Sequence, residues 1–88
     1  MPTMSLTMYS TPWCGYCHRL KRQLSDEGIT FEDVDLDRDA EAARFVAGVN
    51  GGNHTVPTVR FADGSTLTNP SLAQVTTRLA EVEGARQT

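Results

Sequence analysis

The chain has 88 residues, two cysteines and a net charge of −3. A chain of this length forms one domain, here residues 1–88, and two cysteines are too few for the disulfide framework of many small secreted domains. The negative charge disfavours a nucleic-acid partner, no apolar run could span a membrane, and residues 1–5 do not resemble a signal peptide. We therefore expect a cytoplasmic domain in which a close cysteine pair is catalytic or metal-binding rather than structural.

The first half of the chain alternates between strand and helix patterns. Residues 4–9 alternate apolar and polar side chains, as a short strand does. In residues 14–28 the apolar positions recur at spacings of three and four, which predicts a helix ended by a glycine. Residues 30–36 predict a second strand. A second helix follows, with candidate N-caps at Asp37 and Asp39 and an apolar stripe of Ala42, Phe45, Val46 and Val49.

The second half of the chain predicts a hairpin and a last helix. Residues 56–61 and 66–68 have strand patterns, and the Asp-Gly pair at 63–64 is typical of the turn between them. Asn69 is a good N-cap and Pro70 fits a first helical position, so we expect the last helix to begin there. Its apolar stripe comprises Leu72, Val75, Leu79 and Val82.

The predicted order of elements is β-α-β-α-β-β-α. The opening β-α-β unit requires a parallel crossover, whereas the later strand pair closes as an antiparallel hairpin. The sequence therefore predicts an α/β domain with a four-stranded mixed sheet flanked by three helices.

Both cysteines lie at the start of the first predicted helix, in the run Cys14-Gly15-Tyr16-Cys17. A helix N-terminus favours negative charge, so we expect Cys14 to lose its proton more easily than a free thiol with a pKa of ~8.5. The thiolate is the form that attacks disulfides. Cys17 lies one turn later, on the apolar stripe. We predict an exposed, nucleophilic Cys14 and a sheltered Cys17 able to resolve a mixed disulfide. Trp13 either borders this site with its apolar ring or packs half-buried against the domain.

A zinc site is the alternative use of the two thiols. A closed zinc site usually has four ligands, and the chain offers only His18 and His54 besides the cysteines, without zinc-finger spacing. We therefore expect no bound metal.

The second motif is Thr55-Val56-Pro57. Proline is a poor ladder donor, so its place at the start of a strand is explained if the preceding peptide bond is cis and leaves the Val56 backbone exposed. The tripeptide follows the cysteine pair by about forty residues, and the combination is far more specific than either motif alone.

Together, the cysteine motif, Thr55-Val56-Pro57 and the Asp-Gly turn before the last helix resemble the thioredoxin fold and, within it, the glutaredoxins. The resemblance covers nearly the whole chain. It implies that Cys14 attacks a mixed disulfide between a protein and a small thiol. It also implies that the backbone N–H and C=O of Val56 pair with the thiol, and that Pro57 faces the cysteines.

Three departures from glutathione-using relatives bear on the identity of the small thiol. Those relatives commonly have lysine at the position of Thr11, arginine or lysine at that of His54, and Gly-Gly-x-Asp where residues 68–71 read Thr-Asn-Pro-Ser. Without cationic partners at these positions, the carboxylates of glutathione would lose charge-assisted hydrogen bonds of ~1.5–3 kcal/mol each. Hydroxyls and an amide suit a neutral, hydroxyl-rich thiol better.

The runs 49–53, 55–59 and 61–70 are similar to those of mycoredoxins, the actinobacterial glutaredoxin-like enzymes that use mycothiol, a cysteinyl glucosamine–inositol thiol. This resemblance implies removal of mycothiol from mycothiolated proteins by a monomer without a tightly bound cofactor. Mycothiol would be the co-substrate, and an NADPH-dependent reductase would recycle its disulfide. The resemblance makes Cys14 and Cys17 catalytic and implies substrate contacts from Trp13, Tyr16, His54, Thr55, Val56, Pro57, Thr68 and Asn69.

Three alternatives remain. The chain could be a dithiol redoxin fed by thioredoxin reductase, although residues 68–71 replace the aromatic-Ser-Gly-aromatic-Arg-Pro run of that group. It could be a glutathione-dependent glutaredoxin. It could also bridge an iron–sulfur cluster between two chains, because Gly15 leaves the cysteine loop without the stiffness of proline.

Overall fold

The computed structural model describes residues 6–86. Met4 and Ser5 of the first predicted strand lie outside the described residues, and no helix among those described is long and apolar enough to cross a membrane. The element order β-α-β-α-β-β-α agrees with the prediction. The elements are β1 (Leu6–Ser10), α1 (Gly15–Asp26), β2 (Phe31–Asp35), α2 (Ala40–Val49), β3 (Thr58–Phe61), β4 (Thr66–Thr68) and α3 (Leu72–Arg86).

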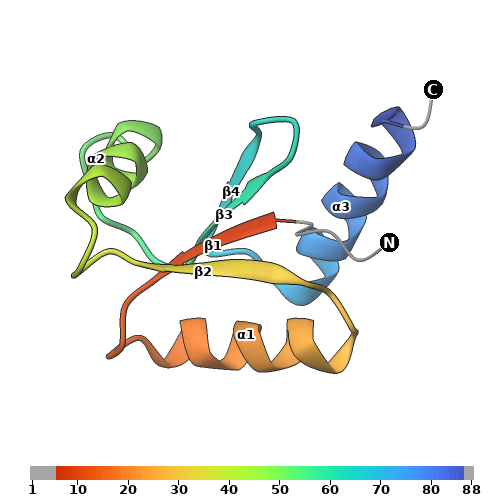
Figure 1. Cartoon of the computed structure of the whole chain (residues 1–88), viewed down its shortest axis with the longest axis horizontal. Coiled ribbons are helices and arrows are strands. Elements are labelled where there is room, and N and C mark those ends of the chain that lie inside the picture. Colours follow the sequence, from red (N-terminus) through yellow and green to blue (C-terminus); the bar gives the residue numbers. More distant parts are fainter. Residues whose placement is uncertain (1–5, 87–88) are drawn as a thin grey trace.

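The four strands form one mixed sheet in the order β2-β1-β3-β4 (Figure 1). β1 pairs in parallel with β2 and antiparallel with β3, and β3 pairs antiparallel with β4. The parallel crossover and the hairpin predicted from the sequence are therefore both present. β1 is a central strand, and its C-terminal end at Ser10 leads directly to the cysteine loop.

Successive residues of β1 point to opposite faces of the sheet, and each face has its own core. Met8 packs with the apolar stripes of α1 and α3, whereas Tyr9 packs with Leu36 and with Val46 of α2. Figure 1 shows α1 and α2 on opposite sides of the sheet accordingly. Met8 and Val46 are fully buried, and each such side chain contributes about 1.5–3 kcal/mol relative to an exposed one.

The first two strands differ from their predicted ends by one residue, and the predicted starts of β3 and α3 were wrong by two. β3 begins at Thr58 rather than at residue 56, since Pro57 has no N–H to donate to the ladder. α3 begins at Leu72 rather than at Pro70. Its first turn is closed by a capping box in which the Gln74 N–H donates to Ser71 Oγ (3.2 Å) and the Ser71 N–H donates to Gln74 Oε1 (2.8 Å).

Candidate functional site

Cys14 is the N-cap of α1. The turn after β1 is closed by a hydrogen bond from the Cys14 N–H to the Thr11 carbonyl (3.3 Å), which brings the cysteine to the helix start. The Cys14 side chain then accepts the Cys17 N–H, with 3.1 Å between nitrogen and sulfur. This amide and the positive end of the helix dipole favour a negative charge on the Cys14 sulfur.

The expectation of an exposed Cys14 was wrong. Only 6% of the residue is exposed, because its side chain packs in the core cluster that also contains Cys17 and Leu20. Trp13, which precedes Cys14, and Tyr16, two residues after it, are both 72% exposed.

Cys17 is fully buried, as its place on the apolar stripe predicted. Burial and then the hydrogen bond with the Cys14 side chain raise the pKa of Cys17 to about 12, although the Thr11 backbone and the Lys21 charge partly oppose this. Cys17 is therefore a neutral thiol at physiological pH. Both cysteines are free thiols in this structure, and they differ in position: Cys14 caps α1, whereas Cys17 lies within the helix on its buried face.

An ion-pair network supports the cysteine loop from the sheet side. Asp33 of β2 accepts a hydrogen bond from the Ser10 hydroxyl (2.7 Å) and pairs with the Lys21 ammonium of α1 (2.8 Å). It thereby ties the end of β1 and the middle of α1 to one strand. No local pattern predicted this network, because its bonded residues are 12 and 23 positions apart in the chain.

A groove of about 380 Å³ lies between α1, the loop before β3 and the start of α3. Three residues that the sequence placed in the substrate site, Tyr16, Pro57 and Asn69, line it together. Asn69 has a left-handed backbone (φ 49°), a conformation that asparagine tolerates better than most residues. The remaining lining residues are Arg19, Leu20, Gln23, Pro70, Ser71, Leu72 and Gln74.

The Val56–Pro57 peptide bond is cis, as the sequence suggested. The Pro57 carbonyl accepts the Asn69 N–H (2.7 Å), and the Thr55 carbonyl accepts the Thr58 hydroxyl (2.8 Å). In the described part of the chain, no such bond engages the backbone N–H or C=O of Val56, which leaves both groups available to an extended ligand.

Five of the predicted substrate contacts lie outside the groove lining, as do both cysteines and Thr11; the five are Trp13, His54, Thr55, Val56 and Thr68. His54 is exposed in the loop after α2, and Thr68 is exposed with its hydroxyl donating to the Asn50 side chain. Thr11 is only 4% exposed and lies beneath the surface. Among the side chains that the structure describes, those of residues 6–83, its hydroxyl is the one buried polar atom without a hydrogen-bond partner.

We expect Thr11→Val to raise the free energy of unfolding by about 1 kcal/mol, because valine has nearly the same shape and removes a buried hydroxyl that makes no hydrogen bond. Urea denaturation of the reduced protein measures this difference. Thr11→Ser, which keeps the hydroxyl and loses a methyl group, is the matched control and should not stabilise the protein. A destabilised Thr11→Val protein would show that the hydroxyl has a partner in solution.

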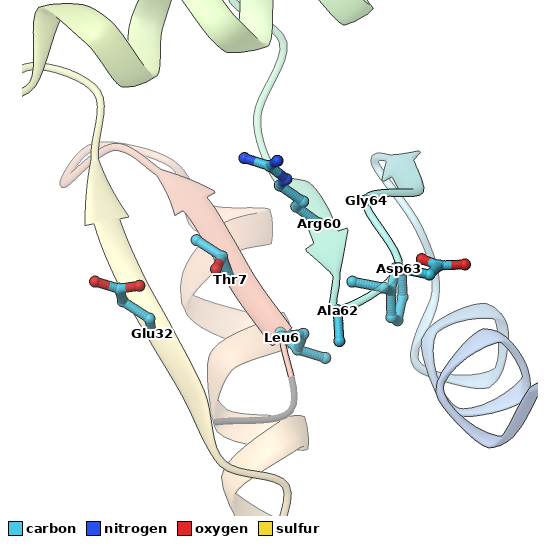
Figure 2. A pocket seen from close by; sticks show the side chains of 8 residues that line it. Leu6, Thr7, Glu32, Arg60, Ala62, Asp63 and Gly64 are labelled. Atoms are coloured by element: carbon cyan, nitrogen blue, oxygen red, sulfur yellow. The ribbon is translucent and has the colours of Figure 1, made fainter. Parts of the chain in front are cut away.

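A slightly larger hollow, of about 420 Å³, lies at the opposite end of the sheet (Figure 2). Figure 2 shows Glu32, Thr7 and Arg60, which come from three adjacent strands, on its wall. Neither cysteine lines this hollow. The cysteines do not line the groove beside α1 either, but that groove contains Tyr16 of the cysteine motif and the cis-proline Pro57, and it is the candidate site despite its smaller volume.

Comparison with known proteins agrees with this geometry. The family model for glutaredoxin matches residues 6–65. A Mycobacterium tuberculosis protein whose name assigns it provisionally to the glutaredoxins is 55% identical over 84 residues, which are 96% of this chain and 100% of the relative. Mycoredoxin 1 of Corynebacterium glutamicum is 43% identical over 75 residues, 85% of this chain and 92% of the relative.

Among solved structures, the glutaredoxin-like NrdH-redoxin of Escherichia coli has a TM-score of 0.69 at 28% identity, covering 84% of this chain and 93% of that one. The glutaredoxin of Archaeoglobus fulgidus has a TM-score of 0.70 at 21% identity and covers 85% of each chain, which supports the thioredoxin-type fold. With a helix-capping cysteine, a buried partner thiol and a family match over more than half its length, the chain belongs to the glutaredoxin family of thiol–disulfide oxidoreductases.

Proposed function

We propose that this protein is a cytoplasmic, mycothiol-dependent oxidoreductase that releases mycothiol from mixed disulfides with proteins. The observation that carries the proposal is the Cys14 sulfur, held at the N-terminus of α1 by the Cys17 N–H at 3.1 Å. The likeness to Mycoredoxin 1 of Corynebacterium glutamicum, at 43% identity, supports mycothiol as the thiol.

The groove lining also supports a neutral, hydroxyl-rich thiol. Its polar groups are mostly hydroxyls and amides, such as those of Tyr16, Ser71 and Gln74, and Arg19 is the one charged side chain among its lining residues. Sugar and inositol hydroxyls both donate and accept hydrogen bonds, as amide side chains do. A thiol with two free carboxylates would find one cationic partner there.

In the proposed cycle, the Cys14 thiolate attacks the mycothiol sulfur of a protein–mycothiol disulfide. A bond forms between Cys14 and that sulfur, the original S–S bond breaks, and the protein thiolate leaves and takes a proton from water. A second mycothiol thiolate then attacks the adduct, which gives mycothiol disulfide and restores the Cys14 thiolate. An NADPH-dependent reductase supplies the two electrons that return the disulfide to mycothiol.

The experiment that tests this function is a coupled assay with three electron sources: mycothiol with its reductase, glutathione with glutathione reductase, and thioredoxin reductase alone. We expect reduction of a mycothiolated protein with mycothiol and at most slow reduction with the other two. A clear preference for glutathione would contradict the argument from neutral groove residues.

A dithiol redoxin is the second candidate function, because the fold is also close to that of the Escherichia coli NrdH-redoxin. In that case both cysteines would cycle through an intramolecular disulfide, and thioredoxin reductase would sustain turnover in the same assay without any small thiol.

A further inference from the structure

The side chain of Asn50 joins α2, β3 and β4 and does not line the groove. Asn50 is the C-cap of α2, and its Nδ2 donates to the Val46 carbonyl (3.0 Å) and to Thr58 Oγ1 of β3 (3.2 Å). Its Oδ1 accepts the Thr68 hydroxyl of β4. One amide thus satisfies the end of a helix and links two strands.

This linkage continues to the ligand loop. The Thr58 hydroxyl, which accepts from Asn50, donates to the Thr55 carbonyl at 2.8 Å, and Thr58 is fully buried. On the other side, Thr68 precedes Asn69, whose N–H donates to the Pro57 carbonyl at 2.7 Å. The Thr55 end of the loop is therefore held by Thr58, which is bonded to Asn50. The Pro57 end is held by Asn69, the neighbour of Thr68, which is also bonded to Asn50.

The direction of the hydrogen bonds requires an amide at this position. The oxygen of Asn50 takes the Thr68 proton, while its NH₂ group leaves the Thr58 proton free for Thr55. An aspartate of the same shape has no donor, so the Thr58 hydroxyl would turn toward the carboxylate and release the Thr55 carbonyl. Exposed neighbours such as Asn53, with a single long bond to a backbone carbonyl, have no comparable set of partners.

We propose that Asn50 is a positioning residue that sets the separation of the Thr55–Pro57 loop from the Thr68–Asn69 turn and so preforms the groove for the small-thiol co-substrate. The proposal rests on the proposed function for the identity of that thiol. The hydrogen-bonded set of Asn50, Thr58 and Thr68, called the Asn50 clamp below, is a property of the protein without ligand. Asn50 does not line the groove and touches no reacting atom.

The test compares Asn50→Asp and Thr68→Val with Thr76→Val, a matched control whose hydroxyl bonds only the Ala73 carbonyl within α3. Both clamp variants should raise KM for a mycothiol mixed disulfide by about 3–10-fold, the effect of one lost hydrogen bond, and leave kcat within about twofold. Thr76→Val should leave both constants unchanged. Thr68→Ser keeps the hydroxyl and should restore the wild-type KM.

Amide hydrogen exchange supplies a readout that needs no thiol. In both clamp variants the Asn69 N–H should exchange about 3–10-fold faster, because its acceptor Pro57 is no longer held in place. An unchanged exchange rate of the Asn69 N–H in the exposed-site variant Thr68→Val overturns the proposal, even if Asn50→Asp fails to fold. Faster exchange with an unchanged KM overturns it as well. If the wild-type protein does not use mycothiol, the proposed function fails. Hydrogen exchange then still tests whether Asn50 holds the loop in place, and KM is measured for whichever thiol is active.

Discussion

Cys14→Ser is expected to lower the rate of reduction of a mycothiol mixed disulfide by at least about 1,000-fold, because a serine hydroxyl is not ionised near neutral pH and cannot form a disulfide. The loss should occur without a loss of fold, since a serine oxygen can still accept the Cys17 N–H and cap α1. Steady-state reduction of a mycothiolated protein measures the first effect, and circular dichroism measures the second.

The matched control is Cys17→Ser. It should retain a substantial part of the activity, because exchange between the Cys14 adduct and free mycothiol needs only one protein thiol. Loss of activity in Cys17→Ser comparable with that in Cys14→Ser would contradict the single-thiol route and favour the dithiol redoxin.

The second large effect concerns the reactivity of Cys17. In a Cys14→Ser protein, alkylation of native Cys17 at pH 8 should be at least about 100-fold slower than in the same protein unfolded in urea, because burial raises its pKa far above that of a free thiol. The rate should increase about tenfold per pH unit and should reach no plateau near pH 9. Mass spectrometry of timed iodoacetamide reactions gives this profile, and a plateau near pH 9 in the native protein would contradict the raised pKa.

The same shift makes the stability of the reduced wild-type protein dependent on pH. The pKa of Cys17 is raised to about 12 in the folded state, so the unfolded chain loses this proton first as the pH rises. The stability associated with the neutral thiol is complete below the unfolded pKa of ~8.5 and declines as the pH rises toward 12. This decline should be absent from Cys17→Ala.

Much of the fold followed from patterns that act over short distances. Apolar periodicity located the helices, the Asp-Gly pair located the hairpin, and the Asp39 cap of α2 is present with a 3.0 Å bond from the Ala42 N–H. The start of α3 was missed because Asn69 and Pro70 satisfy the local rules for a helix start. The bond from the Asn69 N–H to Pro57 holds that turn in another conformation, and the Ser71 cap begins the helix later.

The residue types of the candidate site could be predicted from the sequence, but the hydrogen bonds and packing that hold them in place could not. The spacing of the cysteines and their place at a helix start indicated two unequal thiols, and Pro57 indicated the facing loop. The burial of Cys14 depends on a core shared with residues far along the chain, so the local pattern could not give it. The Asp33 network and the Asn50 clamp were missed for the same reason, since each joins polar side chains that are distant in sequence.

The most direct test of the central claim is the intact mass of Cys17→Ser after brief reaction with a mycothiolated protein and no free mycothiol. Without Cys17 to resolve it, the first intermediate should accumulate. The proposed cycle predicts one mycothiol attached through a disulfide, located on Cys14 by peptide mapping and absent from the Cys14→Ser, Cys17→Ser double variant. A mixed disulfide with the substrate protein in place of the mycothiol adduct, or no adduct at all, would contradict it.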